Sequence, residues 1–581
     1  VALHVGSVPA VLLVAAIIDL SGIQPPTPLL AVVLLLVWAF ASRTFGASVS
    51  RAVAQRGNLR DVVARIIAVG GVAIGAATAI GRHLLPSAPP TARLAWILAE
   101  EDNAQIVGIA REILNDGPRG AGLADQFGTA FINLPLMLAR VVGGLPDATA
   151  DVRLQAVTLF NLSTVVVILI AGWALSLLTA LPHPVEGLRD RGRTSASGAV
   201  LGALGAAGVA FVSLSFLVVL PMRTGFLTFV WGLTLVLTGS ALVAALPSDT
   251  SWRPRLVVAS GLAATLALVL SSWPFIAPAL LVLLIAPVLW IDRSRLARSV
   301  RRNPRWWATG VLVVTILAAS AIVWFTRWGP AAEVLSYGVD ILLAQASGIS
   351  ADDQGRRAAF GALAVAAVLL LRTRPSTART RLMLAVIGPV AGAGALYAGL
   401  QVAAALLTEG ELNYAGIKLL YGIVTLALAL GLATIQSQTT RFGHIGTLVA
   451  GIALAVIVTS SATARIGTDW WSRTDLGAPP HAEAVVEAIG NTSPDIPIRC
   501  LPNPGTVATD VSRLAAYWCA RWMEDAFNPG RFQGGRDQLL TTSERTFEAT
   551  VTAIEQAWPS EYLFAYRMTM GPGWFGWTGG S

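Results

Sequence analysis

Three adjacent carboxylates, Glu100, Glu101 and Asp102, stand where an apolar part of the chain gives way to a polar stretch. A hydroxyl group is a weak nucleophile, and a carboxylate held beside it can take its proton as it attacks. These residues are therefore candidates for a general base. The alternative is a solvated helix start, because acidic residues are favoured near helix N-termini.

Cations that could bind an anionic group occur further along the chain. Among 41 basic residues, Lys418 is the only lysine, and it lies just inside an apolar segment with Tyr414 four residues before it. A charge in such a place is costly and usually functional. The alternative is a lysine that snorkels to the membrane interface. Arg223 and Arg327 lie at the ends of other apolar segments and are further candidates.

The elements that must position these residues are membrane helices. Of the 581 residues, 55% are apolar and 13% are charged, and the mean hydropathy is +0.66. A spanning helix needs roughly 17–25 mostly apolar residues, and about thirteen such stretches recur along the chain. The first is followed almost at once by the second, so we expect it to remain a helix and not a cleaved signal peptide. The sequence predicts an all-α polytopic membrane protein.

The arginines sit in short blocks between the apolar segments. The net charge is +8, but blocks of this kind mark cytoplasmic loops and not a nucleic-acid-binding face. With these loops placed inside, the acidic cluster begins an outer loop of residues 83–153. The predicted spans are Val8–Ile23, Pro28–Ser42, Ile66–Leu85, Leu154–Leu181, Ala199–Pro221, Phe226–Leu246, Leu256–Leu270, Ile276–Ile291, Ala308–Trp324, Ala358–Leu371, Leu382–Leu407, Ile417–Ile435 and Gly446–Thr459.

The outer loop carries an ordered series of short motifs. Two segments in it, Ala104–Leu114 and Phe131–Val142, are predicted to be helices that lie in the membrane interface. The motifs, in order, are Glu101-Asp102-Asn103, Ile109-Ala110-Arg111, Asn115-Asp116-Gly117 and Asn133-Leu134-Pro135.

This order resembles the first outer loop of the GT-C superfamily, glycosyltransferases that use polyprenyl-phosphate sugars. The spacing from Arg111 sets the carboxylate of that family at Asp102, with Glu101 one position away. Asn103 stands where a second acidic residue is common. The resemblance covers about fifty residues closely, and it leaves open whether Glu101 or Asp102 is the base.

The resemblance implies a membrane enzyme that moves a sugar from a polyprenyl-phosphate donor to an exoplasmic cell-envelope glycan, with inversion at the anomeric carbon. Asp102 or Glu101 would be the base, and Lys418, Arg223 and Arg327 would bind the donor phosphate. The layout of a membrane domain followed by an exported domain resembles actinobacterial cell-wall arabinofuranosyl- and mannosyltransferases, which favours arabinofuranose or mannose. It also implies a periplasmic active site on the plasma membrane.

The alternative function, which is not enzymatic group transfer, is that of a lipid-linked glycan transporter or flippase. A flippase should carry charged residues at mid-membrane depth in several spans, because such residues mark transport pathways. In this chain the charges gather at the ends of the apolar segments and in the loops. This distribution favours the glycosyltransferase.

Three further residues are candidates for the same outer site. Trp273 begins a Trp-Pro pair at an outer turn, similar to an aromatic-proline element of the GT-C family, although such pairs are also common at membrane boundaries. Asp340 and Asp352 lie in another outer loop and could bind acceptor hydroxyls or a divalent cation; a hydrated loop is the alternative. No other cofactor is indicated, and the sequence has no Cys/His spacing of a metal site.

The composition changes after residue 461, which divides a membrane domain, residues 1–461, from an exoplasmic domain, residues 462–581. The only two cysteines of the chain, Cys500 and Cys519, fall in the second domain, and an exported pair favours a disulfide over two buried thiols. The domain is rich in aromatic residues, which could stack on sugars or pack against the membrane domain. Its closing stretch, Gly571–Trp577, is expected to be a flexible glycine-rich loop.

Overall fold

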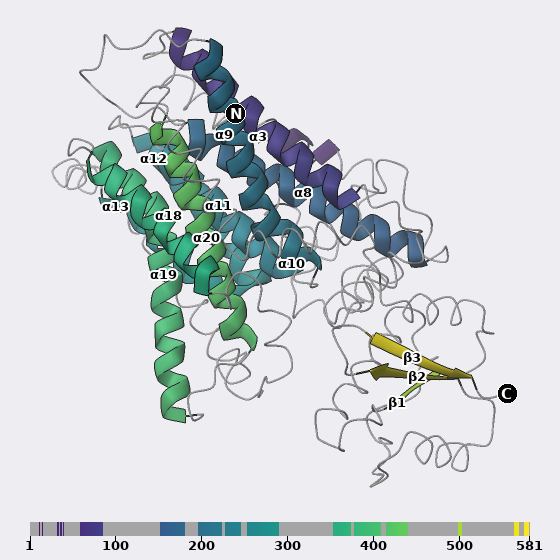
Figure 1. Ribbon diagram of the computed structural model, residues 1–581. Coiled ribbons are helices and arrows are strands. Elements are labelled where there is room, and N and C mark those ends of the chain that lie inside the picture. Colours follow the sequence, from purple (N-terminus) through teal and green to yellow (C-terminus); the bar gives the residue numbers. More distant parts are fainter. Residues whose placement is uncertain are drawn as a thin grey trace.

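Figure 1 shows the computed structural model of the chain. Apart from isolated positions between residues 11 and 39, it describes residues 59–84, 152–180, 196–223, 227–245, 252–289, 353–372, 377–407, 414–439, 498–501, 563–568 and 574–579. Apart from Trp273 and Arg372, which lie at turns, these residues are helical except for three short strands near the C-terminus. The prediction of a helical membrane domain is confirmed to that extent.

The long helices coincide with predicted apolar spans. They are α3 (Leu59–Leu84), α8 (Val152–Ala180), α9 (Ala196–Leu214), α11 (Leu227–Ala245), α12 (Trp252–Ser272), α13 (Ala277–Leu289), α18 (Asp353–Leu371), α19 (Thr377–Leu407) and α20 (Tyr414–Thr439).

Among the described residues, five segments are long and apolar enough to cross a membrane: Asn161–Thr179, Gly202–Val219, Leu227–Ala245, Arg379–Val402 and Lys418–Gln438. Shorter apolar helices cover Ala68–Gly81, Val258–Leu270 and Pro274–Leu284. The predicted spans Val8–Ile23, Ala308–Trp324 and Gly446–Thr459 lie wholly or almost wholly outside the described residues. Of the predicted span Pro28–Ser42, six positions between residues 32 and 39 are described, and all six are helical.

Helix α11 forms the centre of the helical bundle. All of its residues from Phe229 to Ala244 are buried, and it contacts α8, α12, α13, α19 and α20. A helix that is apolar on every side has no preferred outward face, so full enclosure by other helices suits its sequence.

Helices α3 and α9 run side by side and cross at very short range (Figure 1). A methyl group added at Gly71 would overlap the carbonyl oxygen of Ala203, and one at Gly75 would overlap that of Ala207. Gly71 and Gly75 are four residues apart and share a face of α3, as in the small-xxx-small motifs that bring membrane helices together. The backbones therefore approach closely because neither glycine has a side chain.

Helix α9 does not continue as a regular α-helix. A π-helical turn, η1 (Ser215–Val219), follows it directly and leads into the short helix α10 (Leu220–Arg223). The predicted span Ala199–Pro221 therefore contains a change of helical register near its predicted outer end. A 3₁₀ turn, η2 (Pro274–Ile276), makes a similar break between α12 and α13.

Three strands lie in the range predicted to be the C-terminal domain. Strand β1 (Ile498–Leu501) pairs in parallel with β2 (Leu563–Met568), which pairs antiparallel with β3 (Trp574–Gly579). The expectation of a flexible loop over Gly571–Trp577 is wrong from Trp574 onward. Glycine has a low strand propensity, but Gly576 is opposite Tyr566 in the sheet, so pairing with β2 overrides the local preference.

Candidate site at the predicted outer end of the helices

Four chain segments whose ends are predicted to lie outside meet at one end of the bundle. They are η1 with α10, the start of α11, η2, and the start of α20, and each of η1 and η2 contacts both α11 and α20. These segments carry Arg223, Trp273, Tyr414 and Lys418 at or near their ends. The structure thus brings together elements that are up to about two hundred residues apart in the sequence.

The centre of this end is a cluster of aromatic side chains. The ring of Phe229, in the first turn of α11, meets that of Trp273 edge to face, with 4.6 Å between centroids. Tyr421 of α20 lies on another side of Phe229 at 6.0 Å, and Phe275 lies 5.8 Å from Trp273. All four side chains are buried. Edge-to-face and tilted rings at these distances attract each other, which fixes the helix ends relative to one another.

Two glycines make room for the aromatic cluster. A methyl group at Gly422 would lie 3.3 Å from the Phe229 ring, and one at Gly232 would lie 3.5 Å from the Cβ atom of Trp273. The first contact is tight and the second is an ordinary van der Waals contact. A side chain larger than a methyl group at either position would therefore displace the rings. The glycines therefore set how deeply the aromatic side chains sit between the helices.

Trp273 is placed by a compact turn between α12 and α13. Its backbone N–H donates to the carbonyl of Val269 at 2.8 Å, which closes the last turn of α12. Pro274 then opens η2, where its fixed φ suits a first helical position and its missing N–H costs nothing. The Trp-Pro pair predicted from the sequence thus acts as a rigid corner, with the indole turned into the aromatic cluster.

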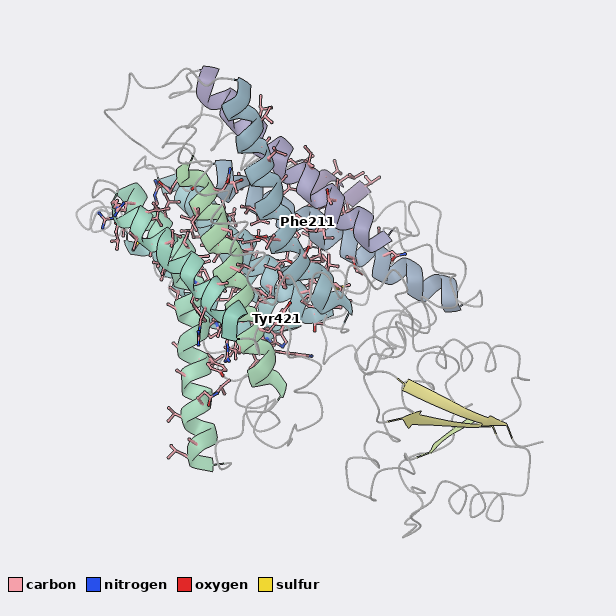
Figure 2. All side chains as sticks on the ribbon, in the orientation of Figure 1. Phe211 and Tyr421 are labelled. Carbon is pink, nitrogen blue, oxygen red and sulfur yellow. The ribbon has the colours of Figure 1, made fainter. Side chains whose placement is uncertain are left out.

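A hydrogen bond joins α20 to the π-helical turn. The hydroxyl of Tyr421 donates to the carbonyl oxygen of Phe216 at 2.5 Å, and this bond is buried. On the other side of the register change, the hydroxyl of Ser215 donates to the carbonyl of Phe211 at 2.7 Å. One hydroxyl therefore donates to a carbonyl within the irregular turn and the other to a carbonyl of the α-helical turn before it. Figure 2 labels Tyr421, the donor of the first bond, and Phe211, the acceptor of the second.

Two of the three predicted phosphate ligands, Lys418 and Arg223, lie on elements that meet at this end of the bundle. Lys418 is half-buried and lies three residues before Tyr421, so the two side chains share a face of α20. Tyr414 is the first residue of α20, and Arg223 is the last residue of α10. Lys418 and Arg223 therefore stand at the ends of two elements that the Tyr421 hydrogen bond connects.

The other predicted site residues lie outside the described residues. This group contains the candidate bases Glu101 and Asp102 with Glu100 and Asn103, the cation Arg327, and the loop carboxylates Asp340 and Asp352. Cys500 lies in β1, but Cys519 lies outside the described residues, so the disulfide stays a prediction. In the part of the chain that the structure describes, no three His, Cys, Asp or Glu side chains come together as metal ligands.

Of the four cluster residues, sequence reasoning selected only Trp273 and missed Phe229, Phe275 and Tyr421. Phe229 lies in a uniformly apolar segment and gives no distinguishing signal. Tyr421 does give one, because a phenol hydroxyl inside an apolar helix needs a hydrogen-bond partner, and its position one turn after the only lysine pointed to the same end of the bundle. The partner, a backbone carbonyl 205 positions away in the sequence, could not be deduced from a residue type.

The comparisons with known proteins yield no relative. No family model matches the chain, and neither a curated protein nor a solved structure matches it.

Proposed function

We propose that this protein is a membrane glycosyltransferase of the GT-C type. It takes a sugar from a polyprenyl-phosphate donor and adds it, with inversion, to a glycan outside the plasma membrane, with arabinofuranose or mannose as the favoured sugar. The observation that carries the proposal is the meeting of the Lys418 and Arg223 elements around one rigid aromatic cluster at the predicted outer end of the helices.

The reaction needs two chemical functions, and the chain offers residues for both. Asp102 or Glu101 takes the proton of the acceptor hydroxyl as its oxygen bonds to the anomeric carbon. The bond between that carbon and the phosphate oxygen breaks on the opposite face, and the lipid phosphate leaves with the electron pair. Lys418 and Arg223 receive the negative charge, so no strong acid is required.

The distribution of charge favours this function over a transporter. Within the five described segments that could cross a membrane, the charged residues are Arg379, Arg381 and Lys418, and all three lie in the first turn of their segment. A flippase would need charged groups near the middle of several spans. The described helices instead keep their charges near the ends, where a headgroup would lie.

The base assignment is tested by sugar transfer in proteoliposomes from a labelled polyprenyl-phosphate sugar. Replacing Asp102 and Glu101 together by alanine should lower the transfer rate by about 10²–10⁴-fold, the usual contribution of a general base. Asp125→Ala, in the same predicted loop but outside the motif, is the matched control and should keep its rate. An unchanged rate in the double variant would show that the base is elsewhere, and lipid translocation without transfer would identify a flippase.

The phosphate assignment is tested by donor binding. Lys418→Ala should weaken binding of the polyprenyl-phosphate donor about tenfold or more, because a charge-assisted hydrogen bond is lost. Lys418→Arg keeps the charge and should retain most of the affinity. Equal donor affinity in the wild type and in Lys418→Ala would remove Lys418 from the site.

A further inference from the structure

We propose that Tyr421 is a positioning residue for the donor-phosphate site. Its hydroxyl, bound to the Phe216 carbonyl, holds the π-helical turn that determines where α10 places Arg223 relative to Lys418. This inference rests on the proposed function and adds to it a residue that touches neither the donor nor the acceptor.

The carbonyl of Phe216 needs a hydrogen-bond donor from outside its own helix. In a π-helix a carbonyl accepts from the N–H five residues later. The residue five positions after Phe216 is Pro221, which has no N–H. The hydroxyl of Tyr421 supplies a donor at 2.5 Å, and a buried carbonyl left without one is costly.

The π-helical turn also determines how the segment that carries Arg223 lies relative to α20, which carries Lys418. Segment η1 continues into α10 without a break, so the position of the Arg223 backbone depends on how many residues the π-turn contains. If that turn relaxed to α-helical register, everything after it would rotate by about 100°, because an α-helix advances one residue per 100°. Lys418 lies on the helix that donates the hydrogen bond, one turn from Tyr421. A single bond therefore joins the segments that carry the two cations.

Tyr421 itself is held in place by burial and by packing against another ring. Tyr421 is 7% exposed and its ring lies against that of Phe229. The Phe229 ring can lie there because the neighbouring Gly422 has no side chain, and a methyl group at Gly422 would come within 3.3 Å of it. The hydroxyl is thus held at a fixed place. π-turns are frequent at functional sites, and this one is stabilised from outside its own helix.

The test compares Tyr421→Phe, which removes only the hydroxyl, with Tyr397→Phe as the matched control. The hydroxyl of Tyr397 accepts a hydrogen bond from Gln401 at 2.9 Å within α19, away from the π-turn. Binding of a sugar-free polyprenyl monophosphate to the full chain in nanodiscs should weaken about three- to tenfold in Tyr421→Phe. Amide hydrogen exchange over residues 215–223 should rise. Neither quantity should change in Tyr397→Phe.

A purely structural role would lower the folded fraction but leave the affinity of the folded protein unchanged. If Tyr421 acts through α10, it should also have no further effect on binding once Arg223 is replaced by Gln, because coupled residues are non-additive. The inference is overturned if hydrogen exchange over 215–223 is unchanged, or if the Tyr421→Phe defect persists in full in Arg223→Gln. Unchanged donor binding in Lys418→Ala would instead overturn the proposed phosphate site. If Lys418→Ala weakens binding but Tyr421→Phe does not, only the role of Tyr421 is overturned.

Discussion

The buried aromatic residues explain how the described helices are held together at one end of the bundle. Between apolar helices in lipid there is little hydrophobic driving force, so packing shape and scattered hydrogen bonds determine the arrangement. Trp273, Phe229 and Tyr421 supply both, since their rings interlock and the phenol reaches a backbone carbonyl. The elements that carry Lys418 and Arg223 meet at this cluster, so its packing determines how these elements lie relative to each other.

The indole of Trp273 should be essential for the stability of this end of the bundle. Trp273→Ala would leave a cavity beside Phe229 and should lower the free energy of unfolding by about 3–5 kcal/mol. Denaturant titration in detergent micelles measures this change. Phe360→Ala is the control, because Phe360 is 41% exposed on α18 and its loss should change stability by no more than about 0.5 kcal/mol. Equal effects of the two substitutions would contradict the packing role of Trp273.

At the scale of elements, hydropathy predicted where the described helices run but not how they end. Each long helix coincides with an apolar run because a helix is the form in which a lipid-buried backbone satisfies its own hydrogen bonds. The π-turn at Ser215 was invisible, because Ser215–Val219 is as apolar as the helix before it. Strand β3 was missed because its glycines resemble a loop, and only its pairing with β2 reveals the strand.

The crossing of α3 and α9 gives a test with two adjacent glycines. Gly71→Ala would place a methyl group against Ala203 and should lower stability by about 1–3 kcal/mol, as overpacking does. Gly70→Ala points into open space and should be neutral or stabilising by up to about 1 kcal/mol, because alanine is the better helix former. The unfolding midpoint in detergent distinguishes them. A Gly70→Ala variant as unstable as Gly71→Ala would show that the crossing does not determine stability.

For the whole molecule, the sequence predicted the class and a set of candidate site residues, but it could not assemble them. Lys418, Arg223 and Trp273 were each selected by their position at the end of an apolar run, and the structure places their elements together. Asp102 was selected by its spacing from Arg111, and it lies outside the described part of the chain. Contacts between distant segments depend on helix packing, which a pattern of residue types does not specify.

The predicted membrane orientation can be tested at the C-terminal ends of two successive helices, α18 and α19. Leu406, 78% exposed near the end of α19, should lie outside, and Arg372, exposed just after α18, should lie in the cytoplasm. In intact cells a membrane-impermeant maleimide should modify Leu406→Cys, and it should modify Arg372→Cys only after permeabilisation. Peptide mass spectrometry separates these sites from Cys500 and Cys519. The reverse labelling pattern would invert the topology.

The Tyr421 bond has a counterpart at the other end of α20, where the amide of Gln436 donates to the carbonyl of Gly202 at 3.2 Å. Both bonds run from a side chain of α20 to the backbone of the α9–η1 segment, and they are about 21 Å apart along the helix axes. To slide past α20 by one turn, α9 would have to break both bonds at once in a medium that offers no replacement donors. In a bilayer whose thickness does not match these helices, the pair would therefore tilt as one unit, without a shift of one helix against the other.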